Sequence, residues 1–192
     1  MKQDIILAGV GGQGILSIAY VIDHAALADG LFFKQAEVHG MAQRGGAVQS
    51  HLRLSDGTIW SDLIPKGEAD LILSVEPLEA LRYLDHLRPD GAVVTSSTPF
   101  KNIPDYPEVE RVLEELRRAP RSVVVDSERL AREAGQVKAQ NVVLLGAAAS
   151  CLILEEASLV RTIESLFRGR GPAVLEANLK AFELGKKAAL GS

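Results

Sequence analysis

The sequence predicts an α/β fold of Rossmann-like type: a mostly parallel sheet with flanking helices, an antiparallel hairpin excursion and a helical C-terminal tail. Three features lead to this expectation. An apolar run near the start ends in a glycine turn and is followed by a helical pattern; short apolar runs then alternate with helical patterns; and from about residue 141 every periodic segment is helical. The length of 192 residues favours one domain spanning residues 1–192.

The first half of the chain predicts strands around one expected hairpin. The elements expected here are a strand at residues 5–10, a helix at residues 15–28 that stops at Gly30, and a second strand at residues 32–38. Glycines and then alternating apolar residues from 48 to 54 follow where a crossover helix would otherwise come. Asp56-Gly57 is typical of a tight hairpin turn, so residues 58–61 are expected to form the returning strand.

The second half returns to alternating strands and helices before the helical tail. The expected elements are strands at residues 70–75, 92–95 and 122–126, a helix from Pro77 to about Leu87, a loop at residues 96–107, a helix around residues 109–116, and a short helix from an N-cap at Ser127 to near Gly135. Residues 142–154 are apolar nearly all round, which places this segment in the core or in an interface.

Composition excludes several classes of protein. Lysine and arginine number 21 against 25 acidic residues, so there is no basic footprint for nucleic acid or an anionic membrane. Apolar runs are too short for a signal peptide or a membrane span, and a cytoplasmic location is expected. Cys151 is the only cysteine, and a buried small side chain is its expected role. The spacing of histidines, carboxylates and serines predicts neither a metal site nor a catalytic nucleophile in this chain.

The glycine turn is the first candidate binding site. Gly9, Gly11, Gly12, Gln13 and Gly14 belong to a G-x-G-x-x-G motif between an expected strand and an expected helix. Glycines let the backbone approach an anion, and the start of the helix supplies free amides and the positive end of its dipole. The motif therefore predicts a phosphate or nucleotide cradle, while close packing of strand against helix is the structural alternative.

An NAD(P)-binding oxidoreductase is one interpretation of this turn. Glu37 follows Gly14 by 23 residues, which suits the acidic residue that contacts ribose in dinucleotide folds. The expected hairpin after the second strand weakens this interpretation, because a dinucleotide fold continues there with a crossover helix.

A second unusual segment lies at the end of the second expected strand. It contains His39, Gln43, Arg44, Gly45 and Gly46, a composition that suits neither a helix interior nor a strand. The guanidinium of Arg44 suits a phosphate or carboxylate, and His39 titrates near neutral pH. Strand ends near such a glycine turn are where α/β sheets bind ligands, so these residues join the candidate site.

Four blocks of sequence together resemble a known family. They are Gly9-Val-Gly-Gly-Gln-Gly14, Glu37-Val-His-Gly-Met-Ala-Gln-Arg-Gly-Gly46, Pro65-Lys-Gly-Glu-Ala-Asp70 and Glu76-Pro-Leu-Glu-Ala-Leu-Arg-Tyr-Leu84. They look like the gamma-type domain of the 2-oxoacid:acceptor oxidoreductases, and the second block is similar to the indolepyruvate branch, the beta subunits of indolepyruvate ferredoxin oxidoreductases. The resemblance covers most of the first 90 residues; beyond that it rests on length and helical character.

The resemblance implies a non-catalytic but required subunit of a hetero-oligomeric complex. Such complexes decarboxylate a 2-oxoacid, here an indolepyruvate or other aryl pyruvate, and make acyl-coenzyme A, CO2 and reduced ferredoxin. Thiamine diphosphate with magnesium and the iron-sulfur clusters are expected on a larger alpha subunit, because this chain has no Gly-Asp-Gly run and only one cysteine. Coenzyme A is then the ligand expected at the candidate site.

Three alternatives remain open from the sequence alone. They are a stand-alone NAD(P)-binding oxidoreductase that uses Glu37, the gamma subunit of a pyruvate or 2-oxoglutarate oxidoreductase, and a structural subunit whose glycine turn binds nothing. Trp60, the only tryptophan, is expected in an interface, in the core or at an edge. The surroundings of Trp60 and residues 142–154 are the surfaces expected to be covered by a partner or a second copy.

Overall fold

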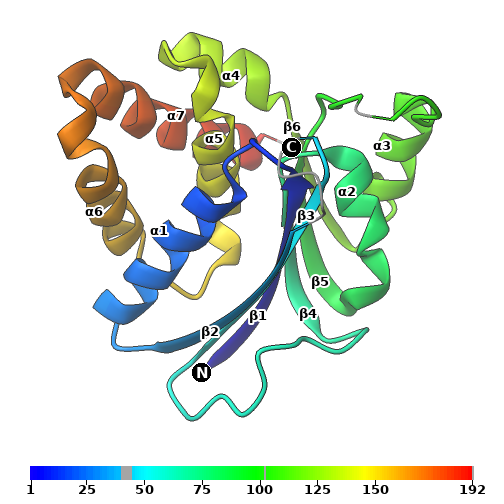
Figure 1. Ribbon diagram of the computed structural model, residues 1–192, viewed down its shortest axis with the longest axis horizontal. Helices are drawn as coiled ribbons and strands as arrows, with labels where there is room; N and C mark the ends of the chain where they lie inside the picture. Colours follow the sequence, from blue (N-terminus) through cyan, green and yellow to red (C-terminus); the bar gives the residue numbers. More distant parts are fainter. Residues whose placement is uncertain (40–44, 102, 192) are drawn as a thin grey trace.

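The computed structural model describes residues 1–39, 45–101 and 103–191, and its centre is a six-stranded sheet (Figure 1). The strands are β1 (Lys2–Val10), β2 (Phe32–His39), β3 (Ala47–Ser55), β4 (Ala69–Ser74), β5 (Leu87–Ser96) and β6 (Arg121–Val125). Their order in the sheet is β2-β3-β1-β4-β5-β6. The pairs β1–β4, β4–β5 and β5–β6 are parallel. Strand β3 runs antiparallel to both β1 and β2. The predicted Rossmann-like, mostly parallel α/β fold is therefore confirmed.

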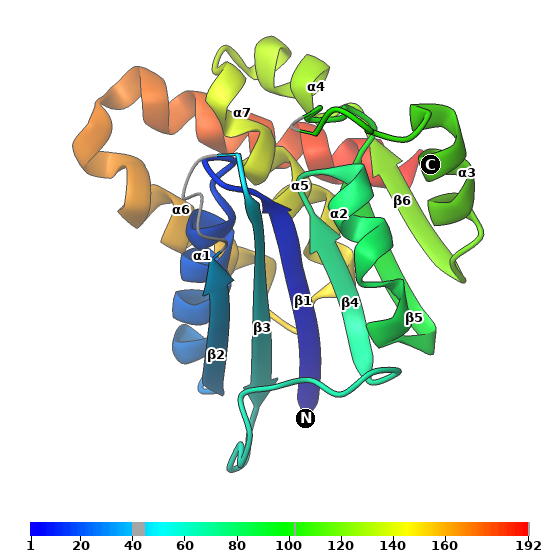
Figure 2. The ribbon, with the colours of Figure 1, turned by 45° about the vertical axis from the view of Figure 1, so that its right-hand side comes forward.

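Helices cover both faces of this sheet. They are α1 (Ile15–Ala28), α2 (Pro77–Arg82), α3 (Val109–Arg117), α4 (Ser127–Ala134), α5 (Gln140–Ala148), α6 (Glu156–Phe167) and α7 (Pro172–Leu190). Short 3-10 turns lie at Leu84–His86, Val137–Ala139, Ala149–Cys151 and Arg168–Arg170. On one face α1 and α5 pack with α6 and α7 outside them, and on the other face α2 and α3 cover β4, β5 and β6 (Figures 1 and 2).

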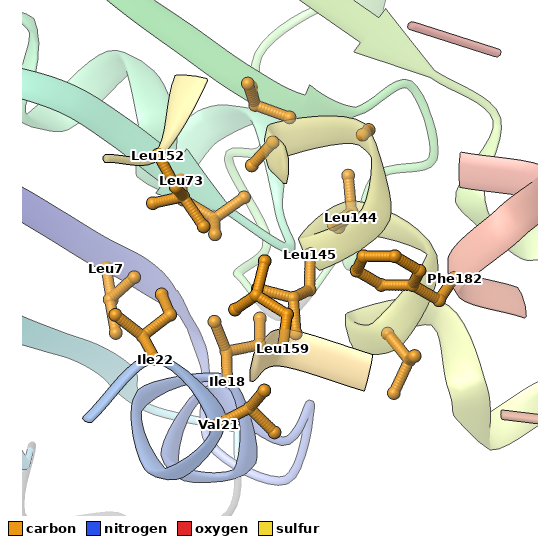
Figure 3. Packing of buried hydrophobic residues seen from close by; sticks show 14 of the residues in the cluster. Leu7, Ile18, Val21, Ile22, Leu73, Leu144, Leu145, Leu152, Leu159 and Phe182 are labelled. Atoms are coloured by element: carbon orange, nitrogen blue, oxygen red, sulfur yellow. The ribbon is translucent and has the colours of Figure 1, made fainter. Parts of the chain in front are cut away.

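The larger core lies between the sheet and the helices of the first face. Figure 3 shows side chains from the sheet (Leu7, Leu73), from α1 (Ile18, Val21, Ile22), from α5 (Leu144, Leu145) and from α6 and α7 (Leu159, Phe182) meeting in one cluster. Because α5 is buried on every side, its amphipathic signal is weak and its residues are apolar nearly all round. The core alternative for residues 142–148 is thus confirmed, and these residues are not available as an interface.

The hairpin predicted at Asp56-Gly57 is wrong. Residues 58–61 form no strand, because β3 already has β1 on one edge and β2 on the other. The antiparallel pair is instead β2 with β3, joined through residues 40–46. Cys151 also differs from expectation: it lies half-buried in a 3-10 turn after α5, with its Sγ 4.0 Å from Arg121 Nη2.

Three smaller features of the fold follow from local sequence. Asp126, one residue before the expected Ser127, caps α4 by accepting a hydrogen bond from the amide of Arg129, and Gly135 ends that helix in a left-handed conformation. Pro77 starts α2 as expected. No helix in the described parts of the chain is long and apolar enough to cross a membrane.

Candidate functional site

The glycine turn connects β1 to α1 through two residues with positive φ. Gly12 has φ of 100° and Gly14 has φ of 82°, in the region that disfavours side chains with a Cβ. The side-chain oxygen of Gln13 accepts a hydrogen bond from the amide of Val10 at 2.7 Å and so closes the turn. No side chain of a described residue caps the start of α1, and its first turn holds no acidic residue, so its amides and dipole are available to an anion.

The turn is also held from outside by α5. Asn141 Nδ2 donates to the carbonyl of Gly14 at 3.2 Å. A Cβ at Gly14 would lie 2.6 Å from the same nitrogen, so this position needs glycine both for its φ and for its contact with Asn141. Gly9 lies against the side chain of Ile15 in a similar way, because a Cβ there would come within 2.7 Å of Ile15 Cδ1.

The two predicted glycine segments lie together. The amide of Gly11 donates to the carbonyl of Gly46 at 2.8 Å, and the amide of Gly45 donates to the carbonyl of Gly11 at 3.3 Å. The backbone of His39 ends β2, opposite Val48. Gln43 and Arg44 lie outside the described residues, so their predicted ligand contacts stay predictions.

A cavity of about 610 Å³ lies beside the turn, at the carboxyl ends of β1, β4 and β5. This is the end of an α/β sheet where ligands bind. Its walls come from the glycine turn, from the segments after β4 and β5, and from the helical part beyond residue 127. The lining includes Gly12, Gln13, Gly14, Ser17, Val75, Thr98, Phe100, Gln136, Lys138, Asn141, Phe167, Arg170 and Asn178.

Two cations in this lining carry no ion pair with any described residue. Lys138 and Arg170 are both exposed, and Arg170 lies over the ring of Phe167 with 5.4 Å between guanidinium and ring centroid. Among the described lining residues the one carboxylate, Glu128, forms an ion pair with Arg132 outside the lining. The start of α5 adds a second uncapped N-terminus without acidic residues. The cavity therefore attracts anions from several directions.

Sequence analysis did not identify Lys138, Asn141 or Arg170. Each lies far along the chain from the glycine turn, and Asn141 is 127 residues from Gly14. The available signal was the position of Lys138 and Arg170 just before the starts of α5 and α7, where a bound anion is favoured.

The geometry does not favour Glu37 as a ribose ligand. In a dinucleotide fold the acidic residue ends the strand next to the glycine turn. Here β3 lies between β1 and β2, so Glu37 is two strand spacings, about 10 Å, to the side. Its carboxylate lies close enough to Asp23 of α1 to influence it, and it accepts a hydrogen bond from Gln35. Burial, and next the charge of Glu37, raise the pKa of Asp23 to about 7.

Metal ligands are not grouped in this region. Among residues 1–39, 45–101 and 103–191, no three His, Cys, Asp or Glu side chains come together as a metal site would require.

Known proteins similar to this chain are subunits of oxidoreductases that act on 2-oxoacids. Residues 4–188 match the protein family described as pyruvate ferredoxin/flavodoxin oxidoreductase. The chain is 39% identical to the indolepyruvate oxidoreductase subunit IorB of Pyrococcus horikoshii, over 98% of this chain and 97% of that one.

Two solved structures share the fold. One is the keto/oxoacid ferredoxin oxidoreductase gamma subunit of Geobacter sulfurreducens, with a TM-score of 0.74, 24% identity and 99% of each chain covered. The other is the 2-oxoglutarate:ferredoxin oxidoreductase of Magnetococcus marinus with 2-oxoglutarate, coenzyme A and succinyl-CoA bound, with a TM-score of 0.80 and 22% identity. That match covers all of this chain and 31% of the longer chain.

Proposed function

Because the chain belongs to the pyruvate ferredoxin/flavodoxin oxidoreductase family, we propose that it is the gamma-type subunit of a 2-oxoacid:ferredoxin oxidoreductase complex. The similarity to a subunit named for indolepyruvate supports an aryl 2-oxoacid as the substrate of the complex. The complex would release CO2, pass electrons to ferredoxin and join the remaining acyl group to the sulfur of coenzyme A. A stand-alone NAD(P) enzyme is not supported, by either the family or the position of Glu37.

The larger subunit of the complex carries the redox chemistry in this proposal. An iron-sulfur cluster needs several thiolates, and this chain has Cys151 alone. It also contains no Gly-Asp-Gly run of the kind that holds magnesium and thiamine diphosphate in the family. When bound on the partner, those groups would activate the 2-oxoacid and move its electrons. The present chain would supply binding and orientation, as a cytoplasmic protein.

The cavity beside the glycine turn is the proposed site of coenzyme A. The observation that carries this proposal is that Lys138, Arg170 and the open starts of α1 and α5 surround one cavity without a competing free carboxylate. The diphosphate and the 3′-phosphate of coenzyme A would occupy that positive field, because phosphates bind best at helix starts and unpaired cations. The thiol end would then reach out toward the partner.

The residues predicted from the sequence have places in this proposal. Gly12, Gln13 and Gly14 would present backbone amides to a phosphate, while Gly9 and Gly11 would shape the turn. Gly45 and Gly46 would hold the second segment against the turn, and His39, Gln43 and Arg44 are proposed to contact the same ligand.

Kinetics of the reconstituted complex test the proposal. Replacing Lys138 and Arg170 together by alanine should raise the KM for coenzyme A at least about a hundredfold and leave the KM for the 2-oxoacid unchanged, because each charge-assisted contact contributes about 1.5 to 3 kcal/mol and two such contacts are lost. The matched control is Arg168→Ala, which removes an exposed arginine from the same 3-10 turn outside the lining. An unchanged KM for coenzyme A would reject this site, and saturable NADH binding in the cavity would favour the dehydrogenase alternative.

A further inference from the structure

The connection from β3 to β4 displays the most exposed aromatic side chain among the described residues. We call residues 56–64 the Trp60 loop. In this loop Trp60 is 89% exposed and Leu63 is 56% exposed, whereas Ile64 at its end is buried in the smaller core. Water therefore surrounds a tryptophan and a leucine that lie three residues apart.

The loop is held in one conformation by side chains of β3. Arg53 Nη1 donates to the carbonyls of Ser61 and Leu63, at 3.1 and 3.0 Å. The amide of Ile64 donates to Nδ1 of His51 at 3.0 Å. Burial, and next the neighbouring His86, lower the pKa of His51 and so keep its ring able to accept this bond.

These anchors are themselves fixed. Arg53 forms a bidentate pair with Asp4, with Nε to Oδ1 at 2.8 Å and Nη2 to Oδ2 at 3.0 Å, and Asp4 is 1% exposed. At the other end of the loop, Asp56 Oδ2 accepts from the N-terminal ammonium of Met1 at 2.6 Å. Buried bidentate pairs of this kind hold geometry well, so the loop is a rigid feature of the surface.

A rigid loop with an exposed tryptophan has the properties of an interface anchor. Fixing a flexible loop on binding costs conformational entropy, and here that ordering is already in place. Tryptophan is enriched among the residues that dominate binding energy, because it buries a large area with few rotatable bonds.

Charge indicates which kind of partner fits. Asp62 lies between Trp60 and Leu63 in the sequence and forms no ion pair with any described residue, whereas Asp56 is paired with the N-terminus. A symmetric contact between two copies of this loop would bring the two Asp62 carboxylates together. A head-to-tail contact between copies would extend into filaments unless it closed into a ring. A contact with a different chain avoids both problems, and the surface that complements Trp60, Leu63 and Asp62 is an apolar pocket with a basic rim.

The loop is remote from the proposed coenzyme A cavity. The Trp60 loop lies at the end of the sheet where β1 and β4 begin (Figure 2). The cavity lies at the carboxyl ends of the same strands. A chain bound at the Trp60 loop would leave the cavity open.

We propose that the Trp60 loop is the docking element for the larger, thiamine-bearing subunit, with Trp60 and Leu63 entering an apolar pocket whose lysine or arginine rim pairs with Asp62. This inference rests on the proposed function, which supplies that subunit.

Fluorine NMR tests it, because the chain has one tryptophan and gives a single signal when produced with 5-fluorotryptophan. Adding the unlabelled larger subunit should shift this signal and protect it from a soluble paramagnetic probe.

Trp60→Ala should raise the Kd for the larger subunit at least about thirtyfold. Asp62→Lys should slow association and weaken its dependence on salt. Leu190→Ala, which trims a residue that is 80% exposed at the end of α7, is the control and should change nothing.

The outcomes separate this inference from the proposed function. Binding of the larger subunit with the fluorine signal unshielded, and with Trp60→Ala binding equally well, overturns the docking role and leaves the proposed function standing. No binding by the wild-type chain rejects both. A signal that becomes shielded as the labelled chain alone is concentrated would identify a second copy as the occupant, and this also overturns the inference.

Discussion

Asp23 is a carboxyl group placed where its charge is unfavourable. It lies on α1 facing β2 and is 5% exposed, and its Oδ1 has no hydrogen-bond partner in the described chain. Burial is the larger cause of its raised pKa and the charge of Glu37 is the second. The folded protein thus binds a proton at Asp23 that the unfolded chain releases at a lower pH.

This difference fixes the sign of a pH effect. In the unfolded chain the pKa of Asp23 is 3.8, and in the fold it is about 7. The favourable protonated form is fully present below about pH 4, and stability from this group is lost as the pH rises from about 4 to about 7. Each pKa unit corresponds to about 1.4 kcal/mol, so a pKa difference of about three units limits the stability lost through ionisation of Asp23 to about 4 kcal/mol.

Asp23→Asn should remove this dependence, because the amide keeps the shape of the protonated carboxyl without its charge. Urea unfolding at pH 5 and pH 8 should show the variant gaining stability over the wild type by a few kcal/mol more at pH 8 than at pH 5. Asp105→Asn, at an exposed position, is the control and should leave the pH profile unchanged. Parallel profiles for Asp23→Asn and the wild type would show that the carboxyl ionises without cost.

The glycine turn offers a comparison between two positions with the same backbone constraint. Gly12 and Gly14 both have positive φ, but a Cβ at Gly12 meets open space and one at Gly14 meets Asn141. Gly12→Ala should cost about 1 kcal/mol of stability through backbone strain, and Gly14→Ala at least about 1 kcal/mol more through the added contact. Thermal unfolding of both variants measures the difference. Equal losses would mean that the side chain of Asn141 moves away from the turn without cost.

At the scale of elements, the contact between α5 and α7 depends on two glycines. A Cβ on Gly146 would lie 2.0 Å from the carbonyl oxygen of Phe182, and one on Gly185 would lie 1.8 Å from the carbonyl oxygen of Val143. Backbone atoms cannot move aside as a flexible side chain can, so the two helices must separate if either glycine is replaced.

Gly146→Ala and Gly185→Ala should therefore each lower the free energy of unfolding by about 3 kcal/mol or more, although alanine raises intrinsic helix propensity. Gly169→Ala, whose Cβ would meet open space, is the matched control and should stay within about 0.5 kcal/mol of the wild type. Denaturant unfolding measures all three. A loss below 1 kcal/mol for the first two would indicate that α7 is only loosely docked.

The elements also show how far local sequence patterns lead. Buried strands such as β4, the turn after β1 and the end of α4 at Gly135 were predictable, because apolar runs and glycines act within a few residues. The N-cap of α4 was misplaced by one residue, from Asp126 to Ser127. The strand expected at residues 58–61 was wrong, because the strand partners of β3 are set by long-range pairing with β1 and β2. An Asp-Gly pair indicates a turn without indicating which strand lies beyond it.

The candidate site likewise contains some residues that local motifs predict and others that they do not. Its glycines belong to contiguous motifs, and the hydrogen bonds of Gly11 with Gly45 and Gly46 join those motifs. Lys138 and Arg170 reach the cavity only because the fold brings the segments just before α5 and α7 to its wall. No periodicity or spacing in a single sequence reports such a meeting of distant segments.

At the scale of the whole molecule, the two ends of the sheet have different properties. One end holds a cavity whose cations, Lys138 and Arg170, pair with no described carboxylate, and the other presents the rigid Trp60 loop, whose Asp62 pairs with no described cation. A subunit held at the loop end keeps its cavity open to a ligand that diffuses in, provided that the partner's reacting centre is brought near the cavity by the assembly.

The complete reaction should accordingly require both chains. This chain has one cysteine and no Gly-Asp-Gly run, so by itself it should neither absorb visible light nor turn over a 2-oxoacid. The larger subunit alone would lack the cavity that we propose positions coenzyme A, and loss of such positioning costs orders of magnitude in rate. Reduction of a viologen dye by an aryl 2-oxoacid and coenzyme A should be near zero with either chain alone and should appear when the two chains are mixed.

The Lys138→Ala, Arg170→Ala double variant should restore part of this activity at saturating coenzyme A, because it weakens binding of coenzyme A without removing the subunit. Full activity of the larger subunit without this chain would show that coenzyme A is held elsewhere, and turnover by this chain alone would contradict the division of roles.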